Sequence, residues 1–227
     1  MRTRRMADLL YRDRSERFRS AQAIVNAKIP IVRMKDRVSG IKCDLNTASR
    51  MGVMNSAYVR LCADSDPRAR RLMMLVKLFA SRHDLSGSGR GNHFSSYSVV
   101  MLVIFFLQTQ GILHPLHLLQ EVPGLQKTEI SGLNFAFCRD PSLLPSLQPN
   151  RSSLVELLQG FFLYYSQFTF GNQVTPFCIV TINTAAQQHH TKATPQQYYT
   201  SALLHLNNTT QLHLNTFTSQ HSHTTIQ

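Results

Sequence analysis

The spacing of hydrophobic and polar residues predicts a mixed fold that begins with a helix and two strands. Residues 7–26 carry many charges and have apolar side chains at helical spacing, which predicts an exposed helix. Residues 27–35 and 40–46 alternate or run apolar and predict two strands joined by a turn at "DRVSG". Pro30 favours a position at a sheet edge or at the start of the first strand.

Helical patterns dominate the middle of the chain. Residues 66–85 begin with Asp66 as a cap and Pro67 in the first turn, followed by apolar residues at helical spacing. The stretch 95–110 opens with serines and is nearly all apolar, so we expect a buried central helix there. Residues 152–170 predict another capped helix that is rich in aromatic residues.

The remaining segments are less regular. Asn55 or Ser56 is expected to cap a further helix. Residues 111–150 contain several prolines and predict loops, and from residue 177 the chain is crowded with Thr, Gln, Asn and His, which predicts a disordered polar tail. The expected organisation is therefore a partial first domain over 1–50, a helical domain over 51–176 and a low-complexity tail over 177–227.

Charge changes this picture by pointing to a partner. The formal net charge of the 227-residue chain is +12, and residues 1–90 carry all of it, with 20 Lys and Arg against 8 Asp and Glu. Such an excess indicates an anionic partner, with nucleic acid first. The arginine-rich stretches 2–19 and 68–71 are either solvated faces or contacts to an RNA backbone that do not depend on sequence.

Cysteine spacing and the apolar run argue against other classes. The four cysteines have no C-x-x-C spacing, which predicts free intracellular thiols and neither a zinc site nor a disulfide framework. The run "VVMLVIFFL" is too short to cross a bilayer, so no membrane partner is expected. The sequence carries no indication of the oligomeric state.

Four stretches together resemble one family. "AKIPIVRMKDRVSGIKCDLNT", "MNSAYVRLCADSDPRARRLMMLVKLFASRHDL", "FSSYSVVMLVIFFLQ" and "SSLVELLQGFFLYYSQFTF" are similar, in order and spacing, to the noncanonical poly(A) polymerases and terminal uridylyltransferases. The resemblance covers roughly residues 20–170 and leans toward the mitochondrial poly(A) polymerase branch. It implies an α+β fold, in which the last strands of a polymerase-β-like nucleotidyltransferase palm precede a mostly helical central domain.

The resemblance also implies a chemistry and a set of site residues. Family members transfer AMP from ATP to RNA 3′ ends, using magnesium or manganese ions held by three carboxylates. By resemblance Asp44 is the third of these carboxylates, although a lone strand carboxylate taken by itself is more often structural. The expected nucleotide-binding residues are Ser49, Asn55, Ser56, Lys77, Arg82, Ser96 and Tyr97, with Lys77 on the triphosphate and the Tyr97 ring stacked on the base.

The other two carboxylates of the family are absent from residues 1–43. We therefore expect a chain that begins partway through the palm and is inactive by itself. Two other functions remain open: a terminal uridylyltransferase of the same fold, and a noncatalytic RNA-binding module. The expected location is the mitochondrion, with the cytoplasm as the alternative.

Overall fold

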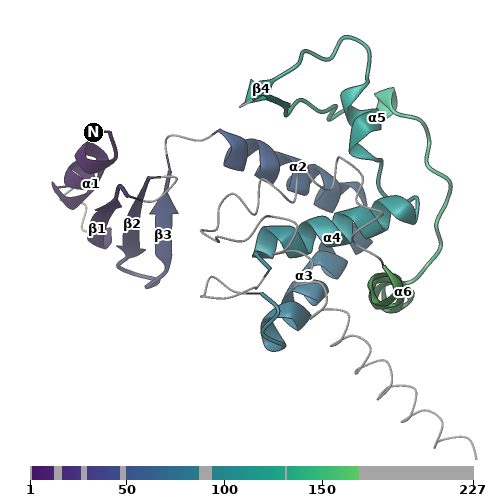
Figure 1. Ribbon diagram of the computed structural model, residues 1–227, viewed down its shortest axis with the longest axis horizontal. Coiled ribbons are helices and arrows are strands. Elements are labelled where there is room, and N and C mark those ends of the chain that lie inside the picture. The colour runs from purple at the N-terminus through teal and green to yellow at the C-terminus, as the bar shows by residue number, and fades with distance from the viewer. Residues whose placement is uncertain are drawn as a thin grey trace, which may run out of the picture. The chain divides into compact units, whose positions relative to one another are not determined.

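The computed structural model describes residues 2–12, 17–26, 30–46, 50–86, 94–130 and 132–168. They form two compact units, shown in Figure 1. The first, here called the sheet unit, contains the described residues up to Ser56 together with Thr128–Phe135. The second, the helical unit, contains Ala57–Lys127 and the described residues from Ala136 onward. The expected boundaries at residues 50 and 176 remain predictions, and the expected tail lies outside the described residues.

The main part of the sheet unit is a helix packed on one face of a three-stranded antiparallel sheet (Figure 1). Its elements are α1 (Arg2–Arg12), β1 (Phe18–Ile24), β2 (Ile31–Asp36) and β3 (Lys42–Leu45), with β2 in the centre. The core is small and consists of Ala7 from α1 with Val32 and Met34 from β2, flanked by partly buried neighbours. Alternation along each strand turns the intervening side chains to the opposite face.

The predicted helix over 7–26 is wrong in its second half, because residues Phe18–Ile24 form strand β1. The side chains of Phe18, Ala21 and Ala23 pack toward the small core, whereas Ser20 and Gln22 are exposed. An irregularity in the pairing between Phe18 and Ser20 interrupts the strict alternation. Because of this interruption, the apolar residues do not alternate strictly, and their spacing resembles that of a helix.

The two strands predicted over 27–35 and 40–46 are confirmed as β2 and β3, and Pro30 directly precedes β2. The turn between them is tight. Gly40 adopts a φ of 70°, a left-handed conformation that glycine tolerates best, and its N–H donates to the Asp36 carbonyl at 3.0 Å. The Asp36 carboxylate accepts hydrogen bonds from the backbone N–H and the hydroxyl of Ser39, which fixes the turn.

The helical unit is built around α4, the apolar central helix that the sequence predicts (Figure 1). Its helices are α3 (Pro67–Arg82), α4 (Ser96–Thr109), α5 (Leu116–Gln120) and α6 (Leu154–Gln167), with a short 3-10 helix at Pro141–Leu143. Helix α2 (Met51–Ser65) runs from the sheet unit into the helical unit, and the strands β4 (Glu129–Ile130) and β5 (Leu133–Asn134) belong to the sheet unit. Among the described helices, none is long and apolar enough to cross a membrane.

Three of the predicted helix caps are confirmed. Asp66 accepts a hydrogen bond from the Arg68 N–H at 2.7 Å, and Ser95 accepts one from the Ser98 N–H at 3.0 Å. Ser153 and Glu156 form a complete capping box at the start of α6. Asn55 and Ser56 are not caps, because α2 begins at Met51 and places both of them inside the helix.

Aromatic packing holds α6 against α4. Phe161 and Tyr165 are fully buried, and the Phe161 ring meets Phe106 of α4 edge-to-face at 5.8 Å between centroids. The Tyr165 hydroxyl donates to the Leu102 carbonyl of α4 at 2.8 Å, so the polar atom of this buried ring is satisfied.

Candidate nucleotidyltransferase site

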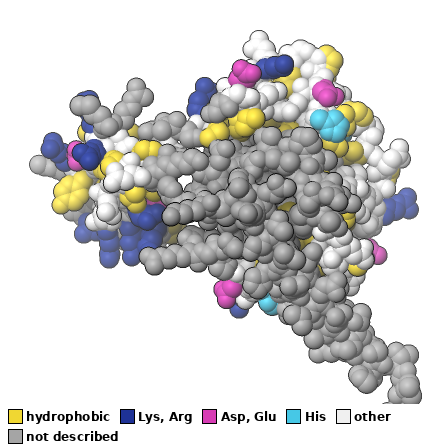
Figure 2. Space-filling model, viewed as in Figure 1, with side chains coloured by type: hydrophobic (Ala, Val, Ile, Leu, Met, Phe, Trp, Pro, Cys, Tyr) yellow, Lys and Arg dark blue, Asp and Glu magenta, His cyan; other side chains and the backbone are white. Residues whose placement is uncertain are grey.

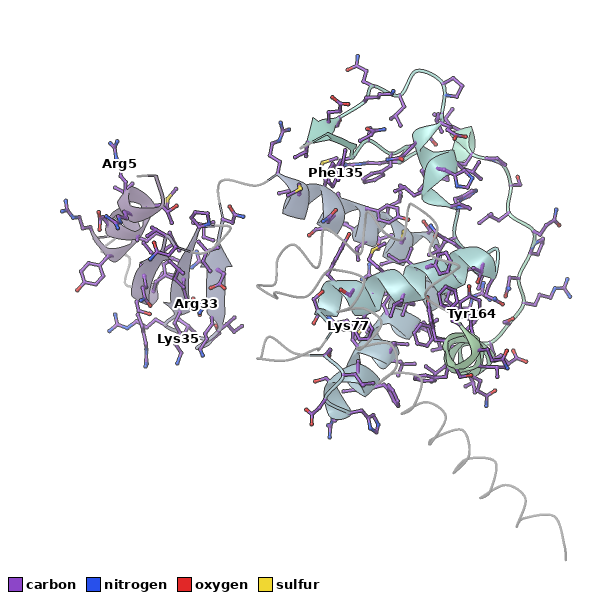
Figure 3. The ribbon with its side chains drawn as sticks, viewed as in Figure 1. Arg5, Arg33, Lys35, Lys77, Phe135 and Tyr164 are labelled. Carbon is purple, nitrogen blue, oxygen red and sulfur yellow. The ribbon has the colours of Figure 1, made fainter. Side chains whose placement is uncertain are left out.

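Asp44 lies on β3, on the sheet face opposite α1. The antiparallel register places it directly across from Arg33 of β2. The two side chains form a bidentate pair, with the Arg33 Nε 2.8 Å from Oδ1 and the Nη2 2.8 Å from Oδ2. Both remain accessible, since 43% of the Asp44 side chain and 51% of the Arg33 side chain are exposed. Figure 3 labels Arg33 and Lys35 on this sheet.

The Arg33 pairing decides what Asp44 can do chemically. Hydrogen bonding from Arg33 holds the pKa of Asp44 below its ordinary value, so the carboxylate is charged near neutral pH. However, the described residues contain no group of three His, Cys, Asp or Glu side chains that could hold a metal ion. One carboxylate already engaged by a guanidinium does not fit a two-metal centre, and the described part of the chain therefore does not supply one.

Arg33 was missed by the sequence reasoning, as were the two lysines beside it, Lys35 and Lys42. These three cations occupy the same sheet face as Asp44. Two features of the sequence could have found them. Arg33 and Lys35 are two residues apart in a strand, so they share one sheet face, and the hairpin register places Lys42 and Asp44 of β3 beside them. Composition alone gave only an excess of positive charge.

Asn55 and Ser56 lie in the second turn of α2, at the edge of the sheet unit. The Ser56 hydroxyl is exposed and donates to the Gly52 carbonyl at 2.8 Å, a local bond that a ligand could replace. Asn55 is half-buried. Ser49 lies outside the described residues.

Lys77 and Arg82 are both exposed on α3 but point in different directions. The buried face of α3 is formed by Ala69, Leu72, Met73, Val76 and Ala80. Lys77 follows Val76 and lies at the edge of that face. Arg82 is five residues further on, which places it about 140° around the helix from Lys77. The two side chains therefore do not share a helix face, and Ser81 is the residue that follows Lys77 by one turn.

Ser96 and Tyr97 form the first turn of α4. Ser95 makes the cap, which leaves Ser96 exposed and not needed for capping. Tyr97 is half-buried, and burial raises the pKa of its hydroxyl well above the ordinary value. Burial also raises the pKa of the nearby Cys62 thiol to about 12. That thiol is therefore unreactive and serves as packing.

A partly buried hydrogen bond links α2 to α4 beside this region. The Tyr58 hydroxyl accepts a hydrogen bond from the Gln108 amide at 3.0 Å, and Tyr58 interacts with Cys62. Helices α3 and α4 pack against each other, so Lys77 and the Ser96–Tyr97 turn are carried by neighbouring elements of one unit. Figure 3 labels Lys77 on α3. The structure thus assigns the expected residues to two groups, with Asp44, Asn55 and Ser56 in the sheet unit and the others it describes in the helical unit.

Proteins of known identity are similar to this chain in sequence. A family model for the central palm domain of mitochondrial-like poly(A) RNA polymerases matches residues 2–63. Poly(A) RNA polymerase GLD2 of Mus musculus is 35% identical over 154 residues, covering 66% of this chain and 31% of that protein. The mitochondrial poly(A) RNA polymerase of Homo sapiens is 36% identical over 152 residues, covering 66% of this chain and 26% of that protein.

Solved structures of similar polymerases resemble the fold of this chain. The crystal structure of mtPAP in complex with GTP has a TM-score of 0.66 and 28% identity, over 74% of this chain and 36% of that one. A mutant of the Cid1 poly(U) polymerase bound to MgATP has a TM-score of 0.59 and 28% identity, over 72% of this chain and 52% of that one. The α+β fold of the polymerase-β-like nucleotidyltransferases is thereby confirmed. The chain spans between about a quarter and a third of the length of these curated relatives, and its sequence and fold are similar to those of the noncanonical poly(A) polymerases.

Proposed function

We propose that this chain supplies the last palm strands and the nucleotide-binding helices of an enzyme that adds AMP from ATP to RNA 3′ ends without a template. Residues 1–50 would contribute to the palm and residues 51–176 would form the helical central domain. The observation that carries the proposal is the pairing of α3 and α4, which brings a lysine, an uncommitted first-turn serine and a half-buried tyrosine onto two packed helices of one unit.

These residues would divide the work of holding a nucleoside triphosphate. The Lys77 ammonium is a mobile point charge suited to the phosphates. The Ser96 hydroxyl, together with the N-terminal N–H groups of α4, suits a further phosphate oxygen. The Tyr97 ring would stack on the base, and its half-buried position near Tyr58 and Cys62 would limit the motion of the ring.

The chain's own contribution to catalysis would be limited. Asp44 is the residue proposed as a magnesium ligand, yet the described residues offer it no carboxylate partners. We therefore expect a polypeptide of these 227 residues to bind nucleotide without adding adenylates to RNA. The name of the human relative supports a mitochondrial location, and the likeness to the solved structure of a cytoplasmic RNA terminal U-transferase supports the cytoplasm as the alternative.

The proposal can be tested by nucleotide-dependent stabilisation of the purified chain. A ligand at 100 times its Kd stabilises the folded state by about 2.7 kcal/mol, which corresponds to a rise in Tm of roughly 5–10 °C for a chain of this size. We expect ATP to raise the Tm, and Lys77→Ala to weaken ATP binding by at least about tenfold, because a charge-assisted phosphate contact is lost. Lys127→Ala, an exposed lysine of the same unit, is the matched control.

The alternatives make different predictions in the same assay. A uridylyltransferase is favoured by the likeness to the Cid1 poly(U) polymerase. It would be stabilised by UTP at lower concentrations than by ATP. A noncatalytic RNA-binding module would show no nucleotide-dependent rise in Tm for the wild-type chain, and that outcome would overturn the proposal. Equal effects of Lys77→Ala and Lys127→Ala would remove Lys77 from the site.

A further inference from the structure

The open face of the three-stranded sheet carries an unusual row of side chains. The register pairs Ser20 of β1 with Lys35 of β2, and Lys35 with Lys42 of β3. The three side chains therefore lie side by side across the strands, on the face opposite α1. The next row is formed by Gln22, Arg33 and Asp44.

The two rows differ in how their charges are balanced. Arg33 is neutralised by its bidentate pair with Asp44. For Lys35 and Lys42, the described residues provide no carboxylate within ion-pair distance. The acid nearest in sequence, Asp36, is engaged by Ser39 of the turn. Like charges directly opposite each other on neighbouring strands destabilise a sheet, so this row costs stability in the free protein.

The two lysines differ in exposure, because Lys42 is exposed whereas Lys35 is half-buried. The Cε atom of Lys35 lies 3.6 Å from the position that a Cβ would take on Gly40, so the stem of Lys35 runs along the turn. Figure 2 shows Lys and Arg side chains gathered over one side of the sheet unit.

We propose that the row of Ser20, Lys35 and Lys42 is a binding surface for the phosphodiester backbone of single-stranded RNA. This inference rests on the proposed function and adds a place on the chain where the RNA substrate is held. Two backbone phosphates neutralise the facing lysines, and one of the phosphates accepts a hydrogen bond from the Ser20 hydroxyl. The two rows contain no aromatic side chain on which a base could stack, so the surface holds RNA without reading its sequence.

The test compares two double variants that remove the same charge from the two faces of one unit. The double variant with Lys35→Gln and Lys42→Gln removes both positive charges from the row. Arg4→Gln with Arg5→Gln removes two exposed arginines from α1, which covers the other face. Binding of a short fluorescent oligoadenylate is measured by anisotropy over a series of salt concentrations, and circular dichroism confirms that each variant is folded.

We expect the lysine variant to bind oligoadenylate roughly tenfold more weakly. The slope of log affinity against log salt should become shallower by about 1.4, which corresponds to two phosphate contacts on a single strand. The arginine variant should retain most of the affinity. Stabilisation by ATP should be unchanged in the lysine variant, because the row is assigned to RNA and not to the nucleotide.

The possible results separate this inference from the function it rests on. If the wild-type chain binds RNA and the two variants lose affinity equally, the binding is diffuse and the assigned surface is wrong, while the proposed function stands. If the lysine variant loses stabilisation by ATP but keeps RNA, the row belongs to the triphosphate and the inference is overturned. If the wild-type chain binds ATP but no RNA, the surface fails together with the RNA part of the function.

Discussion

Each unit of the molecule holds an arginine that meets an aspartate through two hydrogen bonds, and the two pairs have different roles. In the sheet unit, Arg33 and Asp44 are about half exposed and contact each other across two strands. In the helical unit, Arg68 and Asp66 are only 24% and 19% exposed.

Further bonds surround the second pair. Asp66 also caps α3, and the Arg68 Nη1 donates to the carbonyls of Asn150 at 3.0 Å and Ser152 at 2.7 Å. The helical pair thus ties the start of α3 to the segment that leads into α6. The same chemistry is structural where it is enclosed and tied to backbone, whereas it remains available to a ligand where it is open to water.

The largest expected effect concerns burial in the helical unit. Phe161→Ala removes a fully buried ring that packs against Phe106 and Tyr165, and should lower the free energy of unfolding by about 3–5 kcal/mol. Urea unfolding followed by circular dichroism measures this change. Leu163→Ala, two residues away and half exposed, should change it by no more than about 0.5 kcal/mol. Similar losses in both variants would contradict a stability based on burial.

The enclosed ion pair should produce an intermediate effect that depends on pH. Hydrogen bonds from Arg68 hold the pKa of Asp66 below its ordinary value, so its stabilisation is complete above the unfolded-state pKa of about 3.9 and is lost as pH falls through the folded-state value. Asp66→Asn keeps a good cap but loses the charge, and should cost about 1 kcal/mol at pH 7.

The difference between wild type and Asp66→Asn should therefore shrink toward zero in strong acid. Urea midpoints measured from pH 7 downward record it. Glu121→Gln serves as the control, because this exposed carboxylate has no ion pair within the described residues. A difference that stays constant with pH would mean that the Asp66 charge contributes nothing to stability.

The smallest effect is expected in the sheet unit. Arg33→Gln breaks the open pair, and exposed ion pairs contribute little to stability, so the urea midpoint should not move beyond replicate error. The variant frees both Asp44 oxygens without unfolding the sheet. A clear drop in the midpoint would show that this pair, like its counterpart in the helical unit, is a structural element.

The sequence predicted the helical unit better than the sheet unit. Each of its three confirmed caps directly precedes a long segment with apolar residues at helical spacing, namely at Asp66, Ser95 and Ser153. Such local signals decide where a helix begins. Strand β1 was missed because the irregularity after Phe18 disturbs its alternation. The caps expected at Asn55 and Ser56 were wrong because α2 starts at Met51, four residues before Asn55.

The site shows the same division between local and long-range information. Asp44, Lys77, Ser96 and Tyr97 were singled out by resemblance, and their roles remain predictions. The Arg33 contact depends on strand register, which no single segment encodes. The angular separation of Lys77 and Arg82 follows from helix geometry and could have been calculated from the sequence.

The tight turn between β2 and β3 makes the length of this segment as important as its composition. Gly40 and Asp36 fix the hairpin, and the hairpin fixes the partner of every residue in β3. Adding or deleting one residue there would shift the pairing by one and turn Asp44 toward α1. Over evolutionary time, substitutions in this turn should therefore be tolerated far more often than insertions or deletions.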